Sequence, residues 1–183
     1  RRSGITPAAP GAVSREPVSV AVTAAKPKSL VLRKPSARKP EILAIGSSTG
    51  GPQALFTFLA GLGKKVTVPI VITQHMPPTF TAILAEHIQK LTGIPAQEGA
   101  AGDIVEPGKI LIAPGDCHMT LMHMGTKRVV KLDKGPQVNF CRPAVDPMFK
   151  SVSDLYGAGT LGVVLTGMGC DGREGGRAIV NAG

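Results

Sequence analysis

The sequence predicts an α/β fold: a doubly wound, mostly parallel sheet with flanking helices and an antiparallel hairpin at its edge. Short apolar runs alternate along the chain with longer amphipathic patterns of helical spacing. Two strand-loop-helix units follow one another, and parallel strands need crossover helices of this kind. A later pair of less continuously apolar runs flanks Gly125-Thr126, which is typical of an antiparallel edge element.

The first unit begins at an apolar run, residues 42–51, that stops at a small, polar, glycine-flanked turn. The apolar side chains after the turn recur at helical spacing: Ala54, Leu55, Phe58, Leu59 and Leu62. Gly61 and Gly63 are stop signals, so we expect the helix to end there.

The second unit has its strand at residues 68–73, ended by a Gln-His-Met-Pro-Pro turn that contains His75. Thr79 is the expected N-cap of the following helix, which stops before Gly93. The apolar face expected for this helix consists of Phe80, Ile83, Leu84, His87, Ile88 and Leu91.

The rest of the chain continues the alternation of strands and helices. We expect, in order, a strand at 109–113, hairpin strands at 119–124 and 127–132, a helix at 145–156, a buried strand at 161–166 and a helix starting at 174.

The positive charge of the chain is concentrated at its start. Of the formal net charge of +9, a net +8 lies in residues 1–40, which also hold six prolines and no aromatic residue. Such a segment cannot bury enough apolar surface to fold, so we expect a disordered basic linker. A nucleic-acid-binding arm is the alternative, but it lacks interleaved aromatic residues for stacking. We expect the remaining residues, 41–183, to form one domain.

Cysteine usage and hydropathy point to a cytoplasmic protein. The three cysteines are odd in number and far apart, and the sequence shows no signal-peptide pattern. No apolar stretch approaches the roughly 18 residues of a membrane span. We therefore expect neither disulfides nor membrane insertion.

The turn after the first strand fits a motif for a reactive serine. Residues 46–50, Gly-Ser-Ser-Thr-Gly, match G-x-S-x-G, in which a strand-to-helix turn exposes a serine hydroxyl, here that of Ser48. Gly46 and Gly50 would leave room for a substrate carbonyl and can adopt positive φ. The spacings of nucleotide-binding loops are absent from this turn. A plain strand-to-helix turn remains the alternative.

Three predicted strands end in residues that could act together. Ser48 follows the first strand, His75 the second and Asp171 the last. Ligands of open parallel sheets bind at the carboxyl ends of strands, so we expect the three side chains to meet on one rim. A serine needs a base, and a histidine base needs a carboxylate to orient it. Taken singly, His75 could be a solvated loop residue and Asp171 a helix cap.

Five segments resemble successive signatures of the CheB family of protein-glutamate methylesterases of bacterial chemotaxis. They are AIGSSTGGP at 44–52, ITQHMPP at 72–78, IAPGD with His118 at 112–118, RPAVD at 142–146 and LTGMGCDG at 165–172. The resemblance runs from about residue 42 to the end of the chain.

The resemblance implies a doubly wound α/β hydrolase that removes methyl groups from glutamate methyl esters on the cytoplasmic helices of chemoreceptors. It also implies deamidation of receptor glutamines in some members. By this resemblance Ser48 is the nucleophile, His75 the base and Asp171 its orienting partner. Thr49 lies beside the nucleophile, and Met168 supplies a backbone N–H to the oxyanion. No metal, cofactor or nucleic acid is implied.

The sequence departs from the family pattern in three ways. Cys141 stands where members commonly have a histidine before the Arg-Pro pair. The family domain normally continues with a further strand and helix, so we expect a domain truncated after Gly183. The receiver domain that precedes the linker in full-length members is not in the sequence.

Other readings of single residues and of the whole chain remain open. Cys117, His118 and His123 could in principle bind zinc, although their spacing is not compact. Cys141 and Cys170 are possible nucleophiles on a less suitable loop. A non-catalytic basic binding module and a hydrolase of small esters are the alternative function classes.

Overall fold

The computed structural model describes residues 36–63 and 66–183. The segment predicted as a linker, residues 1–40, lies almost wholly outside the described residues. Its disorder and its boundary at residue 40 therefore stay predictions.

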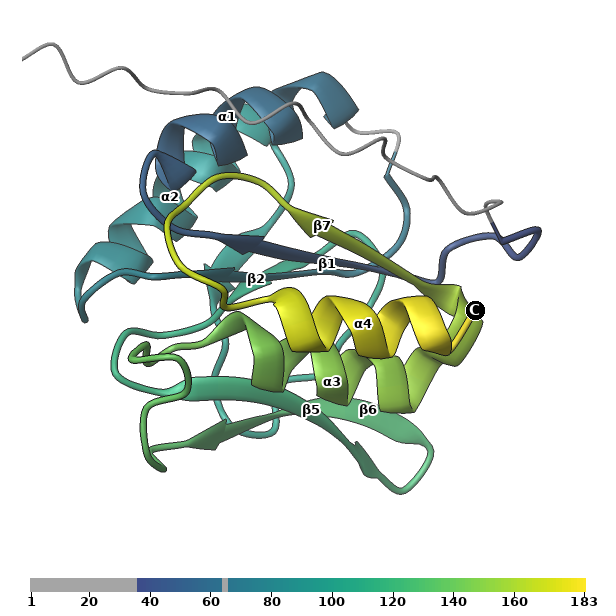
Figure 1. Ribbon diagram of the computed structural model, residues 1–183. Helices are drawn as coiled ribbons and strands as arrows, with labels where there is room; N and C mark the ends of the chain where they lie inside the picture. The colour runs from purple at the N-terminus through teal and green to yellow at the C-terminus, as the bar shows by residue number, and fades with distance from the viewer. Residues whose placement is uncertain (1–35, 64–65) are drawn as a thin grey trace, which may run out of the picture. The chain divides into compact units, whose positions relative to one another are not determined.

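A five-stranded parallel sheet forms the centre of the domain (Figure 1). Its strands run in the order β3-β4-β2-β1-β7. Their bounds are Ala96–Glu98, Ile110–Ile112, Ile70–Gln74, Ile42–Ser47 and Thr160–Val164 in that spatial order. The predicted α/β class and parallel sheet are confirmed, whereas β3 has only three residues and was not predicted.

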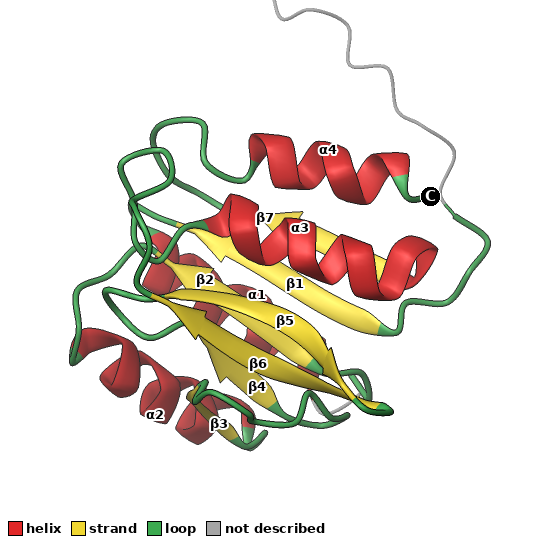
Figure 2. Cartoon of the chain, turned by 90° about the horizontal axis from the view of Figure 1, so that it is seen from below, coloured by secondary structure: helices red, strands yellow, loops and turns green. Residues whose placement is uncertain are grey.

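In the described part of the chain, four α-helices cover the two faces of this sheet. They are α1 (Gly51–Leu62), α2 (Phe80–Thr92), α3 (Val145–Tyr156) and α4 (Arg173–Asn181), and the 3₁₀ turn η2 (Gly157–Gly159) follows α3. Helices α1 and α2 lie on one face, and α3 and α4 lie on the other, as Figure 2 shows. This is the doubly wound arrangement expected when strands and helices alternate.

The strand pleat divides the core into two clusters. Ile42 and Ala44 of β1 point to the α3 side, while Leu43 and Ile45 point to the α1 and α2 side. Alternate residues of a strand face opposite sides, so a strand buried on both faces has a continuous apolar sequence. This explains why β1 has no polar residue before Ser47.

The antiparallel hairpin consists of β5 (His118–Met124) and β6 (Lys127–Asp133). Its predicted position at the edge of the main sheet is wrong, because it forms a separate two-stranded sheet. Met119 and Leu121 belong to the same core cluster as the inner face of α3. The backbone N–H of Leu121 also donates to Ser151 Oγ on α3, at 3.0 Å. Packing on a helix therefore replaces pairing with the sheet.

The strand predicted at residues 161–166 is not buried. It forms β7, which pairs with β1 at the edge of the described sheet, and Leu161 and Val164 are exposed. An apolar run alone does not distinguish an edge strand from a central one.

The predicted apolar face of α2 is displaced around the helix. Leu84 and Ile88 are buried as expected, but Phe80, Ile83, His87 and Leu91 are exposed. The buried stripe instead includes the hydroxyl of Thr81, which hydrogen-bonds Glu98 and the N–H of Gly115. A polar residue with partners can replace an apolar one in a buried stripe.

Two predicted helix signals are wrong and two are confirmed. Thr79 occupies the N-cap position of α2 but has φ 76 and makes no side-chain capping bond. A capping side chain normally requires extended backbone at that residue. Gly61 lies inside α1, whereas Gly63 and Gly93 end their helices with positive φ.

Candidate active site

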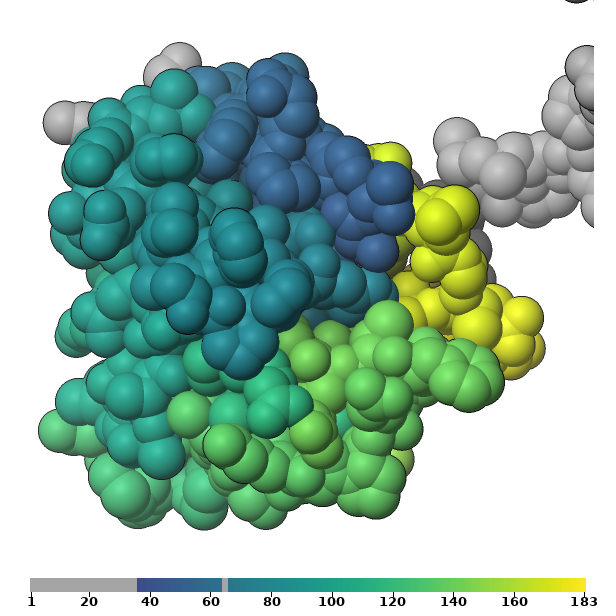
Figure 3. Space-filling view, turned by 90° about the vertical axis from the view of Figure 1, so that its left-hand side faces the viewer, coloured from purple at the N-terminus to yellow at the C-terminus, as the bar shows by residue number. Residues whose placement is uncertain are grey.

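The carboxyl ends of β1 and β2 are placed side by side by their register. Ser47 is paired with Gln74, and the N–H of His75 donates to the carbonyl of Ser47 at 3.1 Å. The N–H of Ser48 donates to the carbonyl of Thr166, which lies beyond β7, at 2.8 Å. Seen from the side toward which the strands run, blue, green and yellow segments border one another (Figure 3).

The turn that carries Ser48 is braced by the buried amide of Gln74. Its Nε2 donates to the carbonyls of Ser48 at 2.9 Å and His75 at 3.1 Å, and its Oε1 accepts from Ser47 Oγ at 2.6 Å. A Cβ at Gly51 would lie 1.9 Å from Gln74 Oε1. The brace therefore requires a glycine at the start of α1, and it holds the serine and histidine loops together.

The glycines of this turn serve packing more than substrate access. Gly50 has φ 74, as its positive-φ role requires. A Cβ at Gly46, however, would lie 2.5 Å from Val145 Cγ1, so the space kept free there is filled by α3 and not by substrate. Gly167 makes the close approach to Ser48, since a Cβ added at Gly167 would lie 2.5 Å from the Cβ of Ser48.

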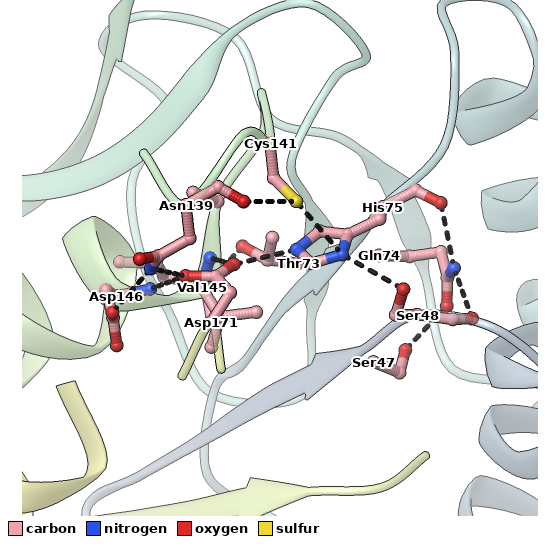
Figure 4. Close-up of polar contacts among 12 residues, drawn as sticks. Ser47, Ser48, Thr73, Gln74, His75, Asn139, Cys141, Val145, Asp146 and Asp171 are labelled. Atoms are coloured by element: carbon pink, nitrogen blue, oxygen red, sulfur yellow. Dashed lines mark hydrogen bonds and ion pairs between the residues drawn. The ribbon is translucent and has the colours of Figure 1, made fainter. Parts of the chain in front are cut away.

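The structure brings Ser48, His75 and Asp171 into one hydrogen-bonded line (Figure 4). Ser48 Oγ lies 3.1 Å from His75 Nδ1, and His75 Nε2 lies 2.7 Å from Asp171 Oδ2. The ionised carboxylate can only accept, so Nε2 carries the proton and Nδ1 offers its lone pair to the serine hydroxyl. This is the geometry that a serine and its base need.

Asp171 is held as a carboxylate by several donors. Its side chain is 3% exposed, and it accepts the N–H groups of Val145 at 2.6 Å and Asp146 at 3.1 Å. Asn139 Nδ2 donates to it at 3.0 Å. Burial raises the pKa of Asp171, but the hydrogen bonds from His75, Val145, Asn139 and Asp146 outweigh it and bring the pKa below its ordinary value.

Asn139 connects this carboxylate to the last helix and was missed by the sequence analysis. Its amide also donates to Asp146 Oδ2 at 2.8 Å, and Asp146 Oδ1 accepts the N–H of Gly175 in α4 at 2.7 Å. Asn139 has φ 52, a conformation that asparagine tolerates better than most residues. The tolerance of asparagine for this conformation was the available signal in the sequence. It does not identify the hydrogen-bond partners of Asn139, which lie 7 and 32 residues away.

Cys141 lies against the same histidine. Its Sγ is 3.5 Å from His75 Nδ1 and 3.4 Å from the carbonyl of Asn139. Burial and the neighbouring Asp171 raise the pKa of the Cys141 thiol, so it stays protonated at neutral pH. Of the two groups at Nδ1, the serine hydroxyl is the closer.

A cavity of about 150 Å³ opens beside these residues. Ser48, His75 and Asp171 line it together with Gly167 and Met168. Met168 is 80% exposed at its mouth. Thr49 is exposed on the turn next to Ser48, and its predicted supporting role stays a prediction.

The zinc alternative of the sequence analysis receives no support from His118. This histidine is buried, and both ring nitrogens are engaged, one with the carbonyl of Pro136 at 3.0 Å and the other with the N–H of Ala144 at 3.2 Å. His123 lies exposed on β5.

Within residues 36–63 and 66–183, no helix has the length and apolar character of a membrane span.

The doubly wound sheet thus carries a serine, a histidine and an aspartate in one hydrogen-bonded line at its strand ends. The family model of the CheB methylesterase matches residues 43–183. The chain therefore belongs to the CheB methylesterase family.

Named relatives and a solved structure agree with this membership. A protein-glutamate methylesterase/protein-glutamine glutaminase of Rhodopseudomonas palustris (strain BisB5) is 48% identical over 184 residues, covering all of this chain and 48% of that protein. One from Paramagnetospirillum magneticum is 50% identical, covering 100% of this chain and 50% of the relative. The chain thus spans about half the length of these relatives.

The crystal structure of the Thermotoga maritima CheB methylesterase catalytic domain matches with a TM-score of 0.76 and 40% identity. The match covers 80% of this chain and 77% of that structure. The fold is therefore that of a CheB catalytic domain.

Proposed function

We propose that this chain is a protein-glutamate methylesterase domain, which hydrolyses methyl esters of glutamate side chains on chemoreceptors and also deamidates receptor glutamines. The observation that carries the proposal is the line from Ser48 through His75 to Asp171, three residues that line a small cavity. The family and the names of its relatives supply the substrate. The partners are then the methylated cytoplasmic helices of the receptors and, in full-length members, a receiver domain.

In the first half-reaction Ser48 attacks the ester carbonyl. His75 Nδ1 accepts the hydroxyl proton as the bond to the γ-carbon forms, and Asp171 stabilises the resulting imidazolium through Nε2–H. The protonated Nδ1 then gives the proton to the leaving methoxide, which departs as methanol. The product of this step is a glutamyl ester of Ser48.

In the second half-reaction water replaces the alcohol. His75 Nδ1 removes a proton from water, the hydroxide attacks the acyl carbon, and Ser48 leaves with its proton restored. The free glutamate carboxyl then ionises. A glutamine side chain follows the same course with ammonia as the leaving group.

Backbone N–H groups near the cavity mouth stabilise the negative oxygen of both tetrahedral intermediates. We assign one of these donors to Met168 and place Thr49 as the support next to the nucleophile. Met168 lines the same cavity as Ser48, which supports the first assignment. Donors of this type lower the barrier by about 3 to 4 kcal/mol each.

The activity test uses methanol release from a methylated receptor fragment. Ser48→Ala should lower kcat by a factor on the order of 10⁶, because removing the nucleophile leaves only the contribution of binding and the oxyanion donors. Ser36→Ala is the matched control, since Ser36 is an exposed serine outside the site, and it should leave kcat unchanged. A Ser48→Ala variant that folds and keeps most of its activity would contradict the proposal.

A further inference from the structure

His75, Cys141 and Asp171 form a cluster of groups that commonly bind metal ions. One potential ligand atom from each lies within 4.8 Å of the others. In the described part of the chain, no other group of three or more His, Cys, Asp or Glu residues meets this spacing. Thiolate and imidazole together favour zinc over magnesium or calcium, which prefer oxygen ligands.

The separation of the cysteine and the histidine matches a shared ion. Cys141 Sγ and His75 Nδ1 are 3.5 Å apart. A tetrahedral zinc with a nitrogen ligand at about 2.0 Å and a sulfur ligand at about 2.3 Å places these two atoms roughly 3.5 Å from each other. Ser48 Oγ lies 3.1 Å from the same nitrogen, so this oxygen can serve as a third ligand.

Asp171 prepares the histidine for a metal on this side of the ring. It accepts the Nε2–H of His75 at 2.7 Å, which leaves the lone pair on Nδ1. Metal-binding histidines typically donate their other ring N–H to a carboxylate in this way. The carboxylate is fixed by Val145, Asp146 and Asn139, so it need not move when an ion arrives. Its charge and that of the Cys141 thiolate balance a divalent cation.

We propose that Cys141 and His75 form an inhibitory zinc site inside the hydrolase site, with Ser48 or water completing the coordination. Zinc replaces the thiol proton, which passes to solvent, and it occupies the Nδ1 lone pair. His75 can then no longer accept the Ser48 proton, so hydrolysis stops until the ion is removed. The binding rests on geometry alone, whereas the inhibition rests on the proposed function.

The binding arm of the test uses Co²⁺ as a spectroscopic substitute for zinc, in the full chain under reducing conditions. A thiolate ligand gives a charge-transfer band in the near ultraviolet, and zinc should displace it. Cys141→Ser should abolish the band and weaken zinc binding at least about tenfold, because the soft ligand is lost. Cys141→Ala serves as a second variant if the serine variant does not fold.

Cys170→Ser is the matched control. Cys170 is exposed and lies outside the cluster, with its Sγ 3.9 Å from Asn139 Oδ1. This variant should keep the band and the zinc affinity of the parent. A missing band in the parent, or a band that survives in folded Cys141→Ser, overturns the site.

The activity arm measures methanol release during a zinc titration. The parent and Cys170→Ser should lose activity together and regain it with a chelator, while Cys141→Ser should require at least about tenfold more zinc. A parent that binds zinc through Cys141 and keeps full activity overturns the inhibitory role. A chain with the cobalt band but no esterase activity without metal instead overturns the proposed function and leaves the metal site standing.

Discussion

Asp171 connects the chemistry of the site to the start of a helix. The same carboxylate orients His75 and accepts the first free N–H groups of α3, those of Val145 and Asp146. The first N–H groups of a helix carry partial positive charge and stabilise an anion there. The reading of Asp171 as a cap and its reading as a triad member are therefore compatible, and the helix it serves is α3 and not the α4 that follows it in sequence.

This double role predicts a pH-dependent effect of Asp171→Asn. The pKa of Asp171 is lowered from 3.8 on folding, so its stabilising contribution is complete above 3.8 and is lost as the pH falls through the folded pKa. At pH 7 the substitution should reduce the free energy of unfolding by about 1.5 to 3 kcal/mol and kcat by about 10⁴. Urea unfolding across the acid range measures the first effect.

Asp154→Asn controls for the loss of a charge, because Asp154 is exposed on α3. It should leave both stability and activity unchanged. A stability difference between parent and Asp171→Asn that stays constant with pH would contradict the carboxylate's role.

Gln74 should affect both stability and kcat, although its side chain takes no part in the chemistry. Gln74→Met keeps the length of the side chain but removes hydrogen bonds to Ser47, Ser48 and His75. Unsatisfied buried groups cost about 1 to 3 kcal/mol each, so the melting temperature should fall. A displacement of the serine turn by about 1 Å would also lower kcat on the order of 100-fold. An unchanged kcat in the folded variant would show that the brace does not position Ser48.

At the scale of elements, the site depends on how closely α3 approaches β1. Gly46 makes this close approach possible, since a Cβ at this position would overlap the side chain of Val145. Val145 is also the residue whose N–H holds Asp171. The packing of one helix on one strand therefore sets the position of the carboxylate.

Gly46→Ala tests this coupling. The added methyl group should cost about 1 to 3 kcal/mol of unfolding free energy through overpacking. It should also lower kcat, because Asp171 moves with α3. Gly61→Ala is the matched control: its Cβ would meet nothing within 4 Å, and replacing a helical glycine there should add about 0.5 to 1 kcal/mol. Equal stabilities for the two variants, measured by urea unfolding, would contradict the account.

At the scale of the whole molecule, the sequence predicted what depends on local pattern and strand direction. Apolar runs that end at glycine or proline turns located β1, β2 and β4. The rule that parallel strands present their carboxyl ends on one rim brought Ser48, His75 and Asp171 together. The predicted place of the hairpin at the sheet edge and the predicted burial of β7 were wrong. Both depend on which elements pack against each other, and the local sequence pattern does not determine this. Asn139 and Gln74 were missed as site residues because their partners are distant in sequence.

The most direct test of the central claim is covalent labelling of the whole chain with a serine-directed fluorophosphonate, followed by peptide mapping. Ser48 should carry the label, because His75 Nδ1 makes its hydroxyl nucleophilic. His75→Ala should suppress the labelling while the fold persists in a thermal melt. Label on Ser47 or on another residue, or labelling of Ser48 that is unaffected by His75→Ala, would contradict the account.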